Sequence, residues 1–349
     1  MNTDIWSVLR TGLEAGALTS QQWQILKDWE RTREGRVRAW EITPDDIGPA
    51  LEERFKWLQK LAPQISEFPL SQASLEFCLP FLWELWLPLA LRLGRLRQRL
   101  QRPMVYGLLG GQGTGKTTLS RILQLILNTM GYSCVGFSID DIYKTYEDRQ
   151  KLRQIDPRMI WRGPPGTHDV NLGIEVLKQV RRGQYPITFP RFDKSLHGGQ
   201  GDRGNPEVID EVDIVLFEGW FLGTRPLEQI DWMQAPPPIK TDADRQFAND
   251  MNVKLREYLP LWEKLDYLMI LIPEDYRISQ KWRMQAEQQM RADGKAGMTD
   301  EDVVGFVQYF WKALHPELFI LPLRQAEWVD LVVEVRSDRR PQAIYSPSR

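Results

Sequence analysis

A glycine-rich stretch followed directly by a lysine and two threonines is the part of this sequence best suited to chemistry. Its letters at positions 110–118 are GGQGTGKTT, which match the pattern G-x-x-x-x-G-K-[ST]. An apolar run at 104–109 precedes it and helically spaced apolar residues follow it, as the pattern requires. We expect nine residues here to hold the phosphates of a nucleotide: Gly110, Gly111, Gln112, Gly113, Thr114, Gly115, Lys116, Thr117 and Thr118.

Each residue type in this stretch would contribute to phosphate binding for a separate physical reason. Glycines allow consecutive backbone N–H groups to turn inward as an anion-binding nest, and the helix that follows directs its free N–H groups at the same place. Lys116 adds a point charge for the terminal phosphates, and the Thr117 hydroxyl is a ligand for Mg²⁺. The alternative is a glycine turn that only caps a helix, and a G-x-G-x-x-G dinucleotide fingerprint does not align.

Acidic residues follow two further apolar segments. Asp140 and Asp141 come after the apolar run at 133–138, in the letters SIDDIY, which also include Tyr143. Because ligands bind where parallel strands end, one of the two carboxylates would take a proton from an attacking hydroxyl and the other would hold the metal or the substrate. The alternative is that they cap a short helix.

Glu218 ends the apolar segment 213–217 and is followed by glycine. An acid at the end of such a strand, in a chain with a phosphate loop, would orient the water shell of Mg²⁺ or assist the base. We therefore expect the metal to lie between Thr117 and Glu218, with Lys116, Asp140, Glu218 and Arg283 as the catalytic residues.

A long segment rich in Gly, Pro, Asp and Arg, between 142 and 213, carries charges suited to an anionic substrate. A stretch of that length with little regular structure is usually functional, although charged loops are often simply solvated. The substrate-binding candidates are Asp141, Tyr143, Arg162, His168, Arg191, Asp193, Lys194 and Arg203.

A basic helical segment at 276–291 is predicted to be a lid that closes over the phosphates and excludes water. Arg283 or Lys281 would neutralise charge on the transferring phosphoryl group. The alternative is an amphipathic surface helix.

These side chains must be positioned by alternating strands and helices, the pattern of a parallel sheet covered on both faces. Strands are expected at 104–109, 133–138, 213–217, 267–272 and 330–335, and helices at 116–130, 169–182, 242–258, 275–291 and 300–313. The fold class is α/β: a P-loop NTPase-type parallel sheet of about five strands, plus an N-terminal helical region. We divide the chain into a helical region at 1–102, a P-loop kinase domain at 103–337 with its insert at about 144–212 and its lid at about 275–300, and a polar tail at 338–349.

Bulk properties exclude several other classes. The net charge of −2 gives no basic field for nucleic acid, and the two cysteines, Cys78 and Cys134, have no metal-ligand spacing or disulfide framework. The apolar run at 79–93 contains Pro80, Glu84 and Pro88, so we expect it to be too short and too broken to span a bilayer. We expect a cytoplasmic protein without a membrane or nucleic-acid partner; a membrane-surface role for 81–99 is the alternative. No protein partner is inferable.

Taken together, the blocks GGQGTGKTT, SIDDIY, RGPPGTHD, FPRFDKSLHGGQGDR, LFEGWFLG and WRMQAEQQMRADGKAGMTDEDV resemble the D-glycerate 3-kinase family, over roughly 103–323. That family lies within the P-loop kinases that include uridine kinase, phosphoribulokinase and pantothenate kinase. The resemblance implies phosphorylation of D-glycerate to 3-phosphoglycerate with ATP and Mg²⁺, as in photorespiratory salvage.

Carried over residue by residue, Lys116 and Thr117 match the phosphate and magnesium positions, Asp140 matches the base, and Glu218 matches the acid after the third strand. Ile142 stands where relatives often have Phe, and residues 1–100 have no counterpart in the smaller kinases. Which cation holds the substrate carboxylate stays open. Two alternatives also stay open: a kinase for another small alcohol such as uridine or pantothenate, and a nucleotide-binding regulatory protein without transfer activity.

Overall fold

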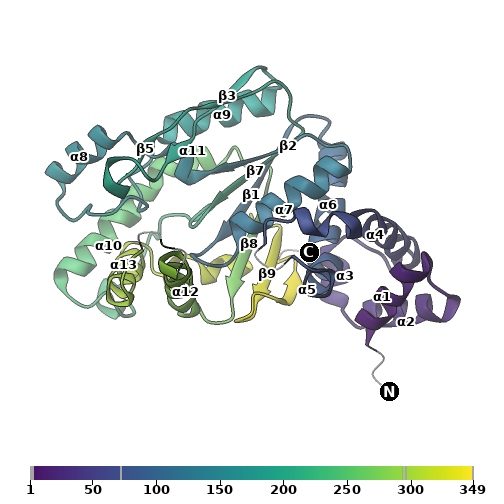
Figure 1. Ribbon diagram of the computed structural model, residues 1–349. Helices are drawn as coiled ribbons and strands as arrows, with labels where there is room; N and C mark the ends of the chain where they lie inside the picture. Colours follow the sequence, from purple (N-terminus) through teal and green to yellow (C-terminus); the bar gives the residue numbers. More distant parts are fainter. Residues whose placement is uncertain (1–3, 71–72, 293, 295–296, 348–349) are drawn as a thin grey trace.

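A mainly parallel sheet organises the chain (Figure 1). The computed structural model describes residues 4–70, 73–292, 294 and 297–347. Within these residues the main sheet has six strands in the order β10-β9-β8-β1-β7-β2, and only the β9–β10 pair is antiparallel. The strands are β1 (Met104–Gly110), β2 (Cys134–Ser138), β7 (Ile214–Gly219), β8 (Tyr267–Pro273), β9 (Leu331–Val335) and β10 (Pro341–Tyr345).

The five parallel strands confirm the predicted ones to within a few residues. The sixth strand, β10, lies in the segment that we expected to be a polar tail, and that expectation was wrong for Pro341–Tyr345. Residues 293, 295 and 296 of the predicted lid and the last two residues of the tail lie outside the described part of the chain.

Alternate residues of each strand enter different hydrophobic cores, because successive side chains of a strand point to opposite faces. In β1, Met104, Tyr106 and Leu108 pack with the N-terminal helices and α7 (Lys116–Thr129). Val105 and Leu109 pack with the helices of the other face. Those helices are α9 (Val170–Arg182), α10 (Asp242–Lys254), α11 (Leu259–Trp262), α13 (Asp300–Ala313) and α14 (Pro316–Phe319). The sheet is thus buried on both sides, as an apolar parallel sheet requires.

The N-terminal region is helical, as predicted, and packs against one face of the sheet through α7 (Figure 1). Its helices are α1 (Ile5–Ala15), α2 (Ser20–Arg31), α3 (Glu34–Ala39), α4 (Ile47–Leu61), α5 (Leu75–Phe81) and α6 (Leu87–Leu100), with a 3-10 helix at Ala62–Glu67. This region and the P-loop face of the sheet share one continuous hydrophobic core.

The prolines do not break the apolar run as we expected. A π-helical turn, Leu82–Trp86, joins α5 to α6, so that Leu75–Leu100 forms one 26-residue helix. Pro88 follows directly after the π-helical turn and has no N–H to donate back into it, yet the helix continues to Leu100. By length and composition alone this helix is long enough to cross a membrane, but 83% of its most apolar window is buried inside the protein, as in a core helix.

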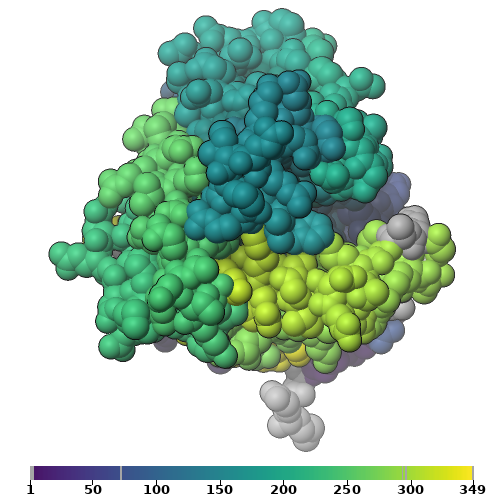
Figure 2. Space-filling model, turned by 90° about the vertical axis from the view of Figure 1, so that its left-hand side faces the viewer, coloured from purple at the N-terminus to yellow at the C-terminus, as the bar shows by residue number. Residues whose placement is uncertain are grey.

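The insert contains more regular structure than its sequence suggests. It holds α8 (Tyr146–Ile155) and two small antiparallel sheets. One pairs β3 (Ile187–Phe189) with β6 (Glu207–Ile209), and the other pairs β4 (Phe192–Asp193) with β5 (Asp202–Arg203). Figure 2 shows the blue-teal start of the insert seated on the yellow-green helical segment. The contact includes Trp161 against Phe306 and the Tyr309 hydroxyl donating to the carbonyl of Arg158.

Candidate active site

The loop between β1 and α7 has the conformation that its glycines permit. Gly113 and Gly115 adopt φ values of +75° and +90°, which favour glycine, and Gly115 is the N-cap of α7. The Thr114 hydroxyl closes the loop by donating to the Gly111 carbonyl at 2.9 Å. Strand, loop and helix therefore follow one another as a phosphate-binding loop requires, and the loop lies at the carboxyl end of β1.

Thr117 and Glu218 meet in the structure. Register pairs Glu218 at the end of β7 with Leu108 of β1 and Ser138 of β2, so the acid stands beside the loop. The Thr117 hydroxyl donates to Glu218 Oε1 at 2.8 Å. Burial raises the pKa of Glu218, and nearby Lys116 opposes this rise.

The second carboxylate oxygen of Glu218 is buried and has no hydrogen-bond partner among the described residues. Such an orphaned oxygen beside a threonine hydroxyl fits the hydrated shell of Mg²⁺, which prefers oxygen ligands. Within the described residues, no cluster of three or more His, Cys, Asp or Glu side chains offers an all-protein metal site. This suits a metal held largely by water and phosphate oxygens.

Asp140 lies in a 3-10 helix, Ile139–Ile142, directly after β2. Its carboxylate accepts from Lys194 Nζ at 2.6 Å and from the Tyr143 hydroxyl at 2.8 Å. Burial raises the pKa of Asp140, but the ammonium of Lys194 and the two hydrogen bonds outweigh it and lower the pKa to about 2. Asp140 is therefore a carboxylate at neutral pH.

Lys116 belongs to the same electrostatic cluster. Burial lowers the pKa of its ammonium, and the carboxylates of Glu218 and Asp140 oppose that lowering. The structure thus brings Lys116, Asp140 and Glu218 together from three different elements, as the sequence predicted.

Asp141 has a different role from Asp140. Its carboxylate accepts from the backbone N–H of Ser138 at 2.9 Å, which completes a capping box, and from Arg191 at 3.0 Å. Arg191 also donates to the Gly136 carbonyl and pairs with Glu207. The alternative that one acid of the pair caps a helix holds for Asp141. A substrate contact by Asp141 or Arg191 stays a prediction.

Two further substrate candidates are likewise engaged by the protein. Arg203 pairs with Asp169, the N-cap of α9, at 2.6 Å. Asp193 accepts from the backbone N–H and the hydroxyl of Ser195 in a local turn. These contacts organise the insert and leave Lys194 as the cation in direct contact with Asp140.

A buried aromatic stack carries Tyr143 and His168 beside Asp140. The two rings are stacked with centroids 4.6 Å apart, and His168 Nδ1 lies 2.7 Å from the Tyr258 hydroxyl. Tyr258 Oη accepts from the Gly166 N–H and shares a second hydrogen bond with Nδ1 of His168, whose direction is set by the tautomer. Nε2 is buried without a partner in the described structure, and burial lowers the pKa of His168 to about 3. His168 is a neutral imidazole.

Arg162 lies over the ring of Phe192, which packs edge-on against Tyr143. It donates to the carbonyls of Gly199 and Gln200 at 2.8 and 3.0 Å, and its charge acts on Tyr143. Sequence reasoning missed its neighbour Arg149, which donates to the carbonyls of Gln200 and Gly201 and lies over the ring of Phe192. A helical arginine in a charged segment gives no signal that separates it from a surface residue.

The predicted lid helix is α12 (Ile278–Ala292), which packs beside α13 (Figure 1). Arg283 pairs with Glu287 on the same helix and lies 5.3 Å from the ring of Phe306. The contacts recorded for Arg283 do not join it to Lys116 or Asp140, so its catalytic role stays a prediction for a closed state.

Two residues to which our sequence analysis gave no role hold the P-loop. A Cβ on Gly113 would lie 2.5 Å from Trp282 Cβ, so α12 packs directly on the loop. Arg339, in the β9–β10 turn, donates from Nε to the Gly113 carbonyl at 2.8 Å and lies over the Trp282 ring. Our sequence analysis considered only the charges of the lid and placed Arg339 in the tail, so it missed both.

Comparison with known proteins agrees with this geometry. No family model matches the chain. The chain is 35% identical over 231 residues to the chloroplastic D-glycerate 3-kinase of Arabidopsis thaliana, covering 62% of this chain and 49% of that protein. It therefore spans about half the length of that relative. It is 33% identical over 218 residues to the uncharacterized kinase mug58 of Schizosaccharomyces pombe, covering 60% of this chain and 79% of that one.

A solved D-glycerate 3-kinase from Cryptococcus neoformans superposes with a TM-score of 0.66 at 29% identity, over 74% of this chain and 97% of that structure. Uridine and pantothenate kinases match at 27% identity over shorter segments. The phosphate loop, the facing carboxylates and these similarities lead to one conclusion: the chain belongs to the D-glycerate 3-kinase-like family of P-loop kinases.

Proposed function

We propose that the protein transfers the terminal phosphoryl group of ATP to D-glycerate and forms 3-phosphoglycerate. The observation that carries the proposal is the 2.6 Å contact between Lys194 Nζ and the carboxylate of Asp140. It puts a cation directly beside the group that would take the proton. The 3-hydroxyl of glycerate and its carboxylate are separated by two carbons, so the two ends of this short substrate match this pair.

In the proposed reaction the glycerate 3-hydroxyl oxygen forms a bond to the terminal phosphorus while the bond between that phosphorus and the bridging oxygen breaks. The hydroxyl proton passes to Asp140, and ADP leaves with the bridging oxygen's electron pair. Asp140 is available because it is ionised. Lys116 supplies a cation at the phosphates, Lys194 supplies a cation at the substrate carboxylate, and His168 adds a neutral imidazole beside them.

Thr117 and the orphaned oxygen of Glu218 would hold Mg²⁺, directly or through its water shell. An ion bound there would neutralise negative charge on the phosphates. The rest of the proposed catalysis is positioning, since phosphoryl transfer demands little covalent chemistry from the protein.

A coupled ADP-release assay with D-glycerate, uridine and pantothenate as acceptors tests the proposal. We expect turnover with D-glycerate and little with the others. Turnover with uridine alone would reject the assignment. ATP binding without a phosphorylated product from any of the three would favour the regulatory alternative.

Lys194→Met tests the carboxylate contact separately. The variant removes the cation but keeps most of the side chain, so the KM for D-glycerate should rise about 10- to 100-fold while the KM for ATP changes little. Lys178→Met is a matched control, because Lys178 pairs with Glu175 on the surface of α9. A KM effect confined to ATP would remove Lys194 from the acceptor site.

A further inference from the structure

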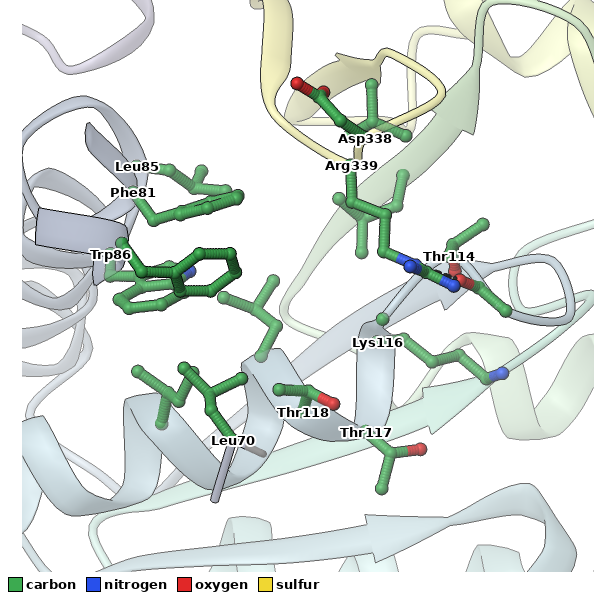
Figure 3. Close-up of a pocket in the computed structure, with 17 residues that line it drawn as sticks. Leu70, Phe81, Leu85, Trp86, Thr114, Lys116, Thr117, Thr118, Asp338 and Arg339 are labelled. Atoms are coloured by element: carbon green, nitrogen blue, oxygen red, sulfur yellow. Dashed lines mark hydrogen bonds between the residues drawn. The ribbon is translucent and has the colours of Figure 1, made fainter. Parts of the chain in front are cut away.

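A cavity of about 500 Å³ lies beside the P-loop, between the sheet and the N-terminal helices (Figure 3). One side is formed by Gly113–Thr118 and by the first turns of α7, including Leu119 and Ile122. Lys116 extends its ammonium away from this space, toward the carboxylates described above (Figure 3). The cavity therefore meets the P-loop on the side away from the terminal-phosphate site.

Aromatic rings from the N-terminal region form the opposite wall. Phe81 and Trp86 are stacked with centroids 5.2 Å apart and an interplanar angle of 15°, and both project toward the side where Arg339 and Thr118 lie (Figure 3). Phe77 packs 5.6 Å from Phe81 and is 41% exposed. Flat apolar rings that border a cavity are surfaces on which nucleobases can stack.

The π-helical turn places part of this wall. Leu85 and Trp86 both line the cavity and both belong to the turn Leu82–Trp86. A π-turn inserts a residue into a helix and so rotates the side chains that follow, and such turns occur frequently at functional sites. The irregular geometry of this helix is thus concentrated at the cavity.

Arg339 closes the cavity at the β9–β10 turn. Its backbone has a φ of +67°, a costly value for arginine. Its Nε is fixed by the Gly113 carbonyl, and its guanidinium carbon lies 4.9 Å from the Trp282 ring centroid. A planar cation held in this way is suited to stack on an aromatic ligand opposite Phe81 and Trp86.

We propose that this cavity holds the adenine ring of ATP, and that the N-terminal helices are therefore part of the nucleotide site. The inference rests on the proposed function, because it assumes a triphosphate on the P-loop. The Thr117–Glu218 contact and Lys116 define the terminal-phosphate end, so the other end of the nucleotide leaves the loop past Thr118. At that end the structure offers an apolar, aromatic space continuous with the loop.

Calorimetry on the full chain measures the affinities for Mg-ATP and for Mg-tripolyphosphate. Comparing the two affinities separates the contribution of the base from that of the phosphates. Phe77→Ala removes a half-exposed ring, and we expect it to weaken ATP about 5- to 30-fold while tripolyphosphate affinity changes less than about twofold. Phe81→Leu, which keeps the buried volume nearly filled, should show the same selective loss. Thermal unfolding of each variant verifies that it is folded.

Trp57→Ala is the matched control, because Trp57 is a half-buried aromatic residue of α4 outside the cavity. It should leave both affinities unchanged. An equal loss of ATP and tripolyphosphate in the Phe77 and Phe81 variants, or no loss of either, would overturn the proposal. If the wild-type protein binds tripolyphosphate as tightly as ATP, the proposed base site is overturned but the proposed function is not. If it binds neither ligand, the proposed function is overturned as well.

Discussion

Asp140 shows how a residue's surroundings decide its chemistry. Asp140 and Asp141 are adjacent in sequence, yet Asp141 is bound to the Ser138 N–H and to Arg191, and burial raises its pKa. Asp140 instead faces Lys194 and Lys116, which keep it ionised. Of the two acids, Asp140 is the one whose carboxylate contacts Lys194 and acts on the P-loop lysine.

Replacing Asp140 by Asn should therefore lower turnover about 10²- to 10⁴-fold, the usual contribution of a general base, because an amide takes no proton. ATP affinity should stay within a few fold, since the phosphates are held by the loop. Steady-state kinetics and calorimetry provide the two measurements. Asp141→Asn, which keeps an acceptor for Ser138, is the control; equal losses of turnover in both variants would contradict the distinction between them.

His168 makes the stability of the protein depend on pH. Burial lowers its pKa to about 3, whereas an unfolded histidine titrates near 6.5. Between these values the unfolded chain binds one proton that the folded chain does not, so stability is complete above about pH 6.5 and falls as the pH drops toward 3.

In that window His168→Gln should remove a slope of about 1.4 kcal/mol per pH unit from the pH dependence of the unfolding free energy. Urea unfolding from pH 7 down to pH 4.5 measures it. His315, whose pKa burial also lowers, contributes in the same direction and stays in both proteins. Parallel curves for variant and wild type would show that His168 is already protonated in the folded state.

At the scale of elements, α12 and the β9–β10 turn fix the P-loop from outside. Gly113 is where they meet, through Trp282 and Arg339. A methyl group at this position would collide with Trp282 and also place a non-glycine residue at φ +75°.

Gly113→Ala should therefore weaken Mg-tripolyphosphate binding by tenfold or more, measured by calorimetry. Gly131→Ala is the matched control, because Gly131 has a φ of +92° but nothing within 4 Å of its ideal Cβ. Both variants bear the backbone cost of about 1–2 kcal/mol, but only Gly113→Ala should affect the ligand. Unchanged binding in Gly113→Ala would mean that the contact with Trp282 does not determine the shape of the loop.

The elements also show which features the sequence could predict. Helix α13 was predicted with its observed bounds, since Thr299 and Asp302 form the capping box that the letters indicate. Asp140 and Glu218 were placed correctly because parallel strands end at one edge of a sheet. The contact of Arg339 with Gly113 joins residues 226 positions apart, so no local pattern carries it. Helix α8 and strand β10 were missed because their polar, proline-flanked segments resemble loops.

For the whole molecule, the continuous core between the N-terminal helices and the P-loop face of the sheet implies that both unfold together. A buried ionic cluster holds the helical part. The Glu30 carboxylate, which is fully buried, accepts from Arg36 at 2.9 Å and from Arg54 at 3.2 Å. Arg36 also contacts Glu84 of the π-helical turn, so this cluster reaches the wall of the proposed base cavity.

Glu30→Ala leaves the buried Arg54 without its carboxylate and Arg36 with Glu84 alone, and it should lower the unfolding free energy by about 3–5 kcal/mol. Glu76→Ala, which breaks an exposed 3.9 Å pair with Arg10, should cost less than about 1 kcal/mol. Mg-tripolyphosphate binds only at the P-loop, so at 100 times its Kd it should add about 2.7 kcal/mol to the same transition that Glu30→Ala weakens. Urea unfolding followed by circular dichroism measures all three effects. The contrary result would be two separate unfolding transitions, of which the one weakened by Glu30→Ala does not shift with tripolyphosphate. That result would show that the helical region unfolds on its own. The shared core would then not couple this region to the nucleotide site.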